Sequence, residues 1–143
     1  MAYVLGFFAA DGTMIVNNRG AHFIEFHSTD RQLISIVKKV LHSNHKISIR
    51  SPRSERHKIG YRLQIGSKEI FKDLMSLGFM PNKSLILSFP LIPKTVQRDF
   101  VRGYFDGDGC VYFKKHKSKD RKEKRWVFTS RFTSGSRKFL QSL

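Results

Sequence analysis

Two short segments place an aspartate in the same sequence context. Residues 4–12 read VLGFFAADG and residues 101–109 read VRGYFDGDG, so each copy has a glycine five positions before an aspartate, and a second glycine follows that aspartate. A repeat of this kind predicts two copies of one structural unit. The repeated acids are Asp11 and Asp108. Carboxylates are ligands that Mg²⁺ prefers, and two of them holding a cation against a phosphate form an arrangement for hydrolysis.

The small residues inside each copy predict how the acids are positioned. Gly6 and Ala10 in the first copy, and Gly103 and Gly107 in the second, are four residues apart. This spacing is typical of helices whose backbones pack closely. We therefore expect the two segments to be helices that lie side by side.

The glycine after each acid, Gly12 or Gly109, is expected to end its helix in the left-handed conformation. Asp11 and Asp108 would then be neighbours at the ends of two helices. Their charges would repel, and each would face the negative end of a helix dipole. A divalent cation between them would relieve both effects, so the sequence predicts a metal site there.

In these two segments the chain resembles the LAGLIDADG homing endonucleases, in the form that has both motifs on a single chain. The glycine and the final Asp-Gly of the signature match in both copies. The resemblance implies an α+β fold of two αββαββα repeats, related by a pseudo-twofold axis, whose antiparallel sheets form a saddle for double-stranded DNA.

The same resemblance implies site-specific hydrolysis of DNA phosphodiester bonds with Mg²⁺ or another divalent metal such as Mn²⁺. Asp11 and Asp108 would be catalytic and metal-binding, and the backbone carbonyls of Ala10 and Gly107 would add metal ligands. Asp106 is a further acid in the second motif, at a position where the family often has Asp. Since its counterpart in the first copy is Ala9, symmetry selects Asp108 as the ligand.

The residues between the motifs predict the remaining secondary structure from their apolar spacing. We expect strands at 13–18 and 22–27, a helix at 31–41, strands at 46–50 and 61–65, a helix at 67–78, a packed connector at 79–93, strands at 111–113 and 126–132, and a helix from residue 137. Residues 1–93 would form the first repeat with its connector, and residues 94–143 the second. The second repeat is expected to be truncated, and the protein to be a monomer if a longer chain completes it.

A sheet covered by helices on one face exposes the other. We place Arg62 and Gln64 on that exposed face, with Arg50 and Arg53 beside the turn that follows the third strand. The resemblance implies that this face lies on DNA, and the major groove admits a β-ribbon.

Residues 114–125, KKHKSKDRKEKR, join the two strands of the second half. A charge run is commonly a solvated loop, but here we expect a hairpin in which Lys114, Lys115 and Lys117 contact phosphates. Such contacts give affinity and little sequence information. Trp126, at the end of the run, is expected in the core.

Three further residues are candidates near the metal. The resemblance implies a basic residue at the end of the fourth strand, and Lys68 is the best match; the alternative is that Lys68 only flanks a helix. Glu25 and Arg131 occupy equivalent places in the two alternating strands and are expected to face DNA. An acid at one place and a base at the other departs from the symmetry of the repeats.

Composition favours a nucleic-acid partner. The chain has 143 residues, 40% of them hydrophobic, and a formal net charge of +16. It is long enough for one compact domain or two small fused units, and its charge predicts binding to a polyanion, first of all double-stranded DNA. No apolar run approaches spanning length and no secretory signal precedes the first motif, so we expect an intracellular protein without a membrane partner. The single Cys110 excludes an internal disulfide and is expected to be buried.

Other functions remain compatible with the sequence. A catalytically silent relative, either an RNA-splicing maturase that binds intron RNA or a transcription regulator, would keep the fold. The retained acid pair argues against pure binding. A basic RNA-binding module unrelated to the family would have no paired acids, and an endonuclease inside an intein is also compatible.

Overall fold

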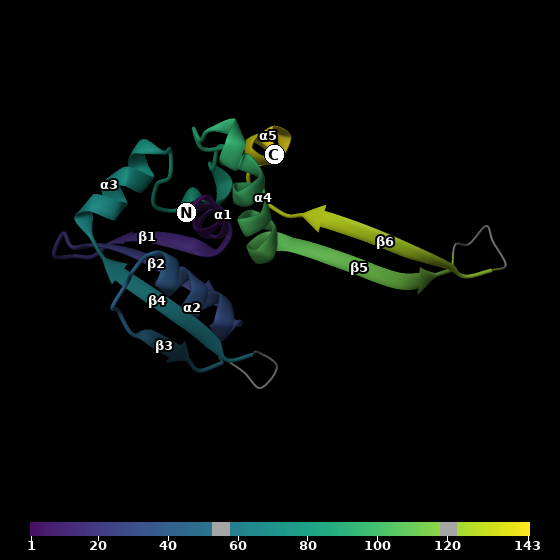
Figure 1. The fold of residues 1–143 in the computed structure, drawn as a ribbon, viewed down its shortest axis with the longest axis horizontal. Helices are drawn as coiled ribbons and strands as arrows, with labels where there is room; N and C mark the ends of the chain where they lie inside the picture. The colour runs from purple at the N-terminus through teal and green to yellow at the C-terminus, as the bar shows by residue number, and fades with distance from the viewer. Residues whose placement is uncertain (53–57, 118–122) are drawn as a thin grey trace.

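The computed structural model describes residues 1–52, 58–117 and 123–143. Two helices, α1 (Ala2–Asp11) and α4 (Lys94–Asp108), lie side by side at its centre, with a four-stranded sheet on one side and a two-stranded sheet on the other (Figure 1). The contact between α1 and α4 is the most extensive between any two elements. The expected pair of motif helices is therefore confirmed.

The first sheet follows α1 directly. It consists of β1 (Gly12–Val16), β2 (His22–Ser28), β3 (Ile47–Arg50) and β4 (Gly60–Gly66), in the order β1-β2-β4-β3 with antiparallel neighbours.

Helices α2 (Arg31–Val40) and α3 (Lys68–Ser76) connect and follow these strands. Asp30 begins α2 by accepting hydrogen bonds from the amides of Gln32 and Leu33, and Ser67 begins α3 by accepting one from Ile70. Alternating strand residues bury one face of the sheet against the helices. These strands and helices contribute to a hydrophobic core that continues into α1 and α4; their share is Met14, Ile24, Phe26, Ile34, Val37, Leu63, Ile65, Phe71 and Leu74.

The opposite face of the first sheet is polar. The strand register places Glu25 between Thr13 and Gln64, and Arg62 between His27 and Ser48. These side chains share one face because successive strand residues point to opposite sides. The prediction of a helix-covered sheet with Arg62 and Gln64 on its other face is confirmed.

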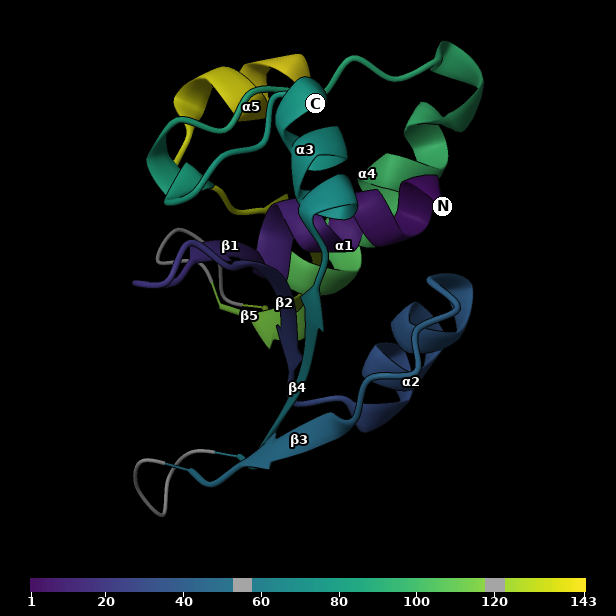
Figure 2. The ribbon, with the colours of Figure 1, turned by 90° about the vertical axis from the view of Figure 1, so that its left-hand side faces the viewer.

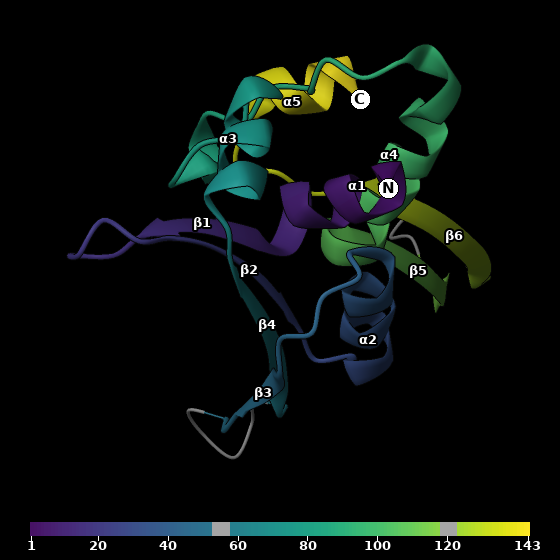
Figure 3. The ribbon, with the colours of Figure 1, turned by 60° about the vertical axis from the view of Figure 1, so that its left-hand side comes forward.

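The second sheet is a ribbon of β5 (Gly109–His116) and β6 (Arg125–Phe132) that extends away from α4 (Figure 1). A 3₁₀ turn, η1 (Lys83–Leu85), lies in the connector, and the last helix is α5 (Arg137–Ser142). Helices α2 and α5 lie on opposite sides of the α1–α4 pair (Figure 2, Figure 3). Within the described residues, every helix falls short of the length and apolar character that a membrane span requires.

Three expectations about the second half were wrong. β5 continues through His116, so Lys114 and Lys115 belong to a strand and not to a loop. Trp126 is 60% exposed, and Cys110 is exposed as well. β5 is longer than expected because it pairs with β6 out to His116 and Arg125. Trp126 and Cys110 are exposed because none of the described helices covers this ribbon, whereas α2 and α3 pack on the first sheet.

The expected left-handed caps were also wrong. Gly12 and Gly109 have φ angles of −84° and −83° with ψ angles of 151° and 157°, which is extended backbone, because each chain enters a strand at once. Glycine is required here for space: a Cβ on Gly12 would overlap the ring of Phe8, and a Cβ on Gly109 the ring of Phe105.

Candidate active site

Glycines bring the backbones of α1 and α4 into direct contact. A Cβ on Gly6 would overlap the carbonyl oxygen of Phe100, and a Cβ on Gly103 would overlap the carbonyl oxygen of Tyr3. The two contacts are the same contact made in both directions, as a twofold relation between the helices requires. The spacing of small residues therefore sets how closely the helices approach.

The contact continues to the acids at the ends of the helices. A Cβ on Gly107 would lie 2.5 Å from the Cβ of Ala10 and 3.2 Å from the Oδ2 atom of Asp11. Burial and then the charge of Asp108 raise the pKa of Asp11 above its usual value, while Lys83 and His27 act in the opposite direction. The structure thus brings Asp11 and Asp108 into electrostatic contact.

Lys83 is a member of this cluster that sequence reasoning missed. It begins η1 in the connector, is 6% exposed, and donates a hydrogen bond from Nζ to the carbonyl oxygen of Gly12 at 2.6 Å. Burial lowers its pKa from 10.5 to about 8, although Asp108 and Asp11 favour the charged form. The sequence predicts only a packed connector here, because the connector has no periodic pattern that would identify a buried lysine.

Tyr104 is a further residue that the charge of the acids reaches. Its hydroxyl donates a hydrogen bond to the carbonyl oxygen of Thr133 at 2.6 Å. Burial raises its pKa, and the nearby charge of Asp108 adds to the shift. The bond anchors α4 to the segment between β6 and α5.

Asp106 has a structural partner of its own. It is exposed and accepts a hydrogen bond from the Tyr3 hydroxyl at 2.6 Å, which links α4 to α1. Burial and this bond raise the pKa of Tyr3 to about 12. The choice of Asp108 over Asp106 as the partner of Asp11 agrees with this geometry.

Lys68 is not brought to the acids. It is exposed at the start of α3, just beyond Gly66, which pairs with Phe23 of β2. Gly12, next to Asp11, pairs with Phe26 of the same strand. Three positions along a strand correspond to about 10 Å, so Lys68 lies toward the other end of the sheet.

The residues expected to face DNA fall into two groups. In the first sheet, Glu25 is 4% exposed and lies among Arg50, Arg62 and Gln64. Arg53 lies outside the described residues. Arg131 pairs with Cys110 as Glu25 pairs with Thr13, so their equivalent places in the two sheets are confirmed.

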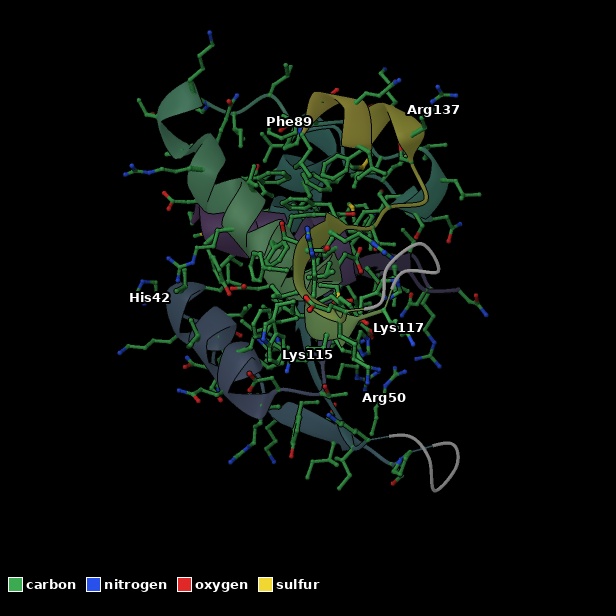
Figure 4. The ribbon with its side chains drawn as sticks, turned by 90° about the vertical axis from the view of Figure 1, so that its right-hand side faces the viewer. His42, Arg50, Phe89, Lys115, Lys117 and Arg137 are labelled. Atoms are coloured by element: carbon green, nitrogen blue, oxygen red, sulfur yellow. The ribbon has the colours of Figure 1, made fainter. Side chains whose placement is uncertain are left out.

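The second group lies on the ribbon. Lys114 and Lys115 belong to β5, and Lys117 follows it. Viewed from the end of the ribbon, Lys117 lies on the same side of the molecule as Arg50 of β3, and His42 at the end of α2 lies on the opposite side (Figure 4). A basic residue of the first sheet and one at the end of the ribbon therefore lie on the same side of the molecule.

The first acid of the pair, Asp11, is accessible. Asp11 and Gly107 line an open hollow of about 850 Å³ between α2 and the central helices. Among the described residues, no group of three or more His, Cys, Asp or Glu side chains could hold a metal ion. Two carboxylates with neighbouring backbone oxygens instead suit Mg²⁺, which keeps several waters and binds through one or two carboxylates.

The chain resembles several solved structures. Matches include the I-LtrWI LAGLIDADG homing endonuclease bound to target DNA (13% identity, TM-score 0.57, covering 87% of this chain and 63% of that one). They also include I-SmaMI bound to an uncleaved DNA target in the presence of calcium ions (15%, 0.56, 89% and 65%). The LAGLIDADG meganuclease I-AabMI bound to uncleaved DNA is a third (13%, 0.53, 90% and 64%).

These matches concern the fold, since the identities are low, and the chain spans just under two thirds of the length of each of these relatives. The α+β architecture inferred from the sequence is thereby confirmed. Among curated proteins, none gives a significant match. The family model described as the LAGLIDADG-like domain matches residues 1–77 and 95–143, and the chain belongs to this family.

Proposed function

We propose that the protein is a site-specific homing endonuclease that hydrolyses phosphodiester bonds of double-stranded DNA. One observation carries the proposal: two converging helices present Asp11 and Asp108 to each other, with the buried Lys83 beside them. Burial, and then the charge of Asp108, raise the pKa of Asp11 and cost stability, and a cation would offset that cost. Solved relatives of the same fold are described as bound to DNA.

Asp11 and Asp108 would hold the metal, with the carbonyl oxygens of Ala10 and Gly107 as further ligands. Mg²⁺, or another divalent cation such as Mn²⁺, supplies Lewis-acid activation of the phosphate and of water when bound. The protein's own residues would position the reacting groups. The two carboxylates would hold the cation at a fixed place against the scissile phosphate, and the close helix contact would keep the carboxylates from moving apart.

Lys83 is proposed to take the role that the sequence suggested for Lys68. Its ammonium group lies in a buried position next to both acids and is fixed by the carbonyl oxygen of Gly12. A fixed positive charge at this place stabilises the negative charge that develops on the phosphate oxygens during hydrolysis.

The DNA would lie across both sheets. Lys114, Lys115 and Lys117 would contact phosphates, and Arg131 would face DNA near the second acid. The first sheet would also face DNA, through Arg50, Arg62, Gln64 and the region of Arg53. The charge of +16 supports such a surface because phosphate contacts dominate affinity.

The domain organisation belongs to the same proposal. Residues 1–93 and 94–143 would each form one repeat around the shared helix pair. The protein would act inside cells on an insertion site of an intron-encoded mobile element, as a monomer that carries both motifs. Intron RNA is the alternative ligand of a relative that binds without cutting.

A pool of supercoiled plasmids with random inserts would test this function. Purified protein is incubated with the pool in Mg²⁺ or in EDTA, and nicked and linear products are sequenced. We expect the wild type to enrich one sequence in Mg²⁺, and the Asp11→Asn/Asp108→Asn double variant to bind DNA without cutting. Asp106→Asn, which changes the exposed acid bound to Tyr3, is the matched control and should still cut.

Two results would count against the proposal. Cleavage by the double variant at the wild-type rate would remove the acids from the chemistry. Tight binding by the wild type, without cleavage in Mg²⁺ or Mn²⁺, would instead identify a catalytically silent relative.

A further inference from the structure

Glu25 is a buried carboxylate on the polar face of the first sheet. Its side chain is 5% exposed, and Gln64 Nε2 donates a hydrogen bond to its Oε1 atom at 2.6 Å. Arg62 Nη1 donates to the same oxygen at 3.2 Å, and His27 Nε2 lies 2.9 Å from Oε2. Arg50 Nη2 lies farther from Oε2, at 3.9 Å. Glu25 thus interacts with polar side chains from β2, β3 and β4.

The bonds hold Arg62 and Gln64 in fixed orientations. Arg62 is also held by its Nε atom, which donates to Ser48 Oγ at 3.2 Å, and Ser48 donates back to the carbonyl oxygen of Arg62. Two bonds at different edges of a planar guanidinium leave it little freedom to rotate. The Arg62 side chain is still 28% exposed, so its fixed plane meets solvent.

Each held side chain keeps groups that can read a base. Within the described residues, the second Nη atom of Arg62 and the amide oxygen of Gln64 have no hydrogen-bond partner. Arg reads guanine through O6 and N7, and Gln reads adenine through N6 and N7. A side chain that is already oriented loses less conformational freedom when it forms such a pair, so more of the pair's energy is available to discriminate between bases.

The second sheet has no such arrangement at the equivalent place. Arg131 is exposed there, opposite Cys110, and within the described residues it has no ion-pair partner. A buried acid is costly unless it is paired and hydrogen-bonded. The first sheet has the acid Glu25 at this place, and the second sheet has the base Arg131. If the fold itself required an acid here, both sheets would have one, so we infer a role for Glu25 that is specific to the first sheet.

We propose that Glu25 is a positioning residue that fixes Arg62 and Gln64 as the base-reading pair of the first sheet, so that Glu25 sets sequence preference without touching DNA. This inference rests on the proposed DNA-binding function. It replaces the direct DNA contact expected for Glu25 from the sequence. The ligand it defines is a duplex with a guanine beneath Arg62 and an adenine beneath Gln64.

Glu25→Gln tests the proposal because it keeps the shape of the side chain and removes its charge. The new amide would place a donor or a weak acceptor against Arg62 and Gln64, so their orientations would no longer be fixed. We expect the preference for the selected sequence over random duplex to fall by about tenfold or more, the scale of one good base contact. Affinity for random duplex should stay equal or rise, since a negative charge leaves a DNA-facing surface.

The experiment is a binding selection from a random-duplex pool in Ca²⁺, with full-length wild type, Glu25→Gln, Arg62→Lys and Gln64→Met. Sequencing of bound DNA gives the preference at each position, and salt titration gives the phosphate contribution. We expect all three variants to lose preference at one adjacent set of base pairs and to keep the wild-type salt dependence. Lys115→Gln is the matched control and should weaken all sequences alike.

The outcomes separate this inference from the function on which it rests. If the wild type selects no duplex sequence, the proposed function fails. If the wild type selects a sequence and Glu25→Gln selects the same one as strongly, only the role of Glu25 is overturned. If circular dichroism shows that Glu25→Gln is unfolded, the test rests on Arg62→Lys and Gln64→Met. The proposal is overturned if these two variants lose sequence preference at unrelated base pairs, or if they lose affinity equally for all sequences.

Discussion

Lys83 Nζ and the carbonyl oxygen of Gly12 are joined by a hydrogen bond of 2.6 Å, which ties the connector to the residue that follows the first acid. The bond places a buried cation beside Asp11 and Asp108, far from Lys83 in sequence. The chemistry proposed for the site depends on this link as much as on the acids, and it leads to the first two predictions.

Lys83→Met should change how stability depends on pH. Because the pKa of Lys83 is lowered from 10.5 to about 8, the unfolded chain holds more protons than the folded chain between these values. The free energy of unfolding therefore gains a contribution that rises with pH across this window, on the order of 3 kcal/mol in total. Urea unfolding at pH 7.5 and pH 10 should show this rise in the wild type and its loss in Lys83→Met.

The exposed Lys94→Met is the control for that comparison and should behave as the wild type does. Equal pH dependence in the wild type and in Lys83→Met would show that the ammonium group is not buried as the structure places it.

Lys83→Met and Lys68→Met should separate the two candidate lysines in a cleavage assay. Loss of a fixed charge aimed at the developing phosphate charge costs about 10² to 10³ in rate, so Lys83→Met should cut poorly while binding DNA nearly normally. Lys68 is exposed at the start of α3 and lies away from the acids, so Lys68→Met should keep most of the cleavage rate. If Lys68→Met cuts poorly and Lys83→Met keeps most of the cleavage rate, Lys68 has the catalytic role that the sequence predicts for it.

Gly103→Ala should destabilise the protein through the helix contact. Alanine normally favours a helix over glycine by about 0.5 to 1 kcal/mol, but here its Cβ would overlap the carbonyl oxygen of Tyr3, which is backbone and has no rotamer to move. Overpacking of this kind costs about 1 to 3 kcal/mol, and separation of α1 from α4 would also disturb the acids. Thermal unfolding and cleavage should both report the loss.

Gly60→Ala is the matched control, since the closest atom to its added Cβ would be the Arg50 Cβ at 3.8 Å, an ordinary contact. A Gly103→Ala variant as stable as the wild type would mean that the helices are not in backbone contact.

The sequence predicted the parts of the site that local pattern encodes. Small residues four apart and the repeated Asp-Gly identified the helix pair and both acids, because helical spacing and the repeat are visible without tertiary structure. Lys83 was missed because its burial depends on how the connector folds back onto β1. The exposure of Trp126 and Cys110 was missed for a related reason: strand alternation indicates which residues share a face, but not whether a helix covers that face.

The basic ribbon should account for part of the salt dependence of DNA binding. If Lys114, Lys115 and Lys117 each neutralise one phosphate, the slope of log affinity against log salt concentration should become less steep by about 0.9 for each lysine changed to Gln. All sequences should weaken together, because phosphate contacts do not distinguish bases. A slope that does not change in the triple variant would show that DNA does not touch the ribbon.

Divalent cations should stabilise the fold through the acid pair. Asp11 has a raised pKa, so at neutral pH its charged form opposes folding. This cost declines as the pH falls through the folded-state pKa and is gone below the ordinary value of 3.8. Asp11→Asn should therefore raise Tm at pH 7 without metal. If Mg²⁺ binds the folded site and not the unfolded chain, it should raise the Tm of the wild type as its concentration passes the dissociation constant, by RT ln(1 + [L]/Kd) in free energy. The Asp11→Asn/Asp108→Asn variant should not respond, while Asp106→Asn should respond as the wild type does. A Mg²⁺-dependent shift of the same size in the double variant would place the cation elsewhere and separate the acid pair from metal binding.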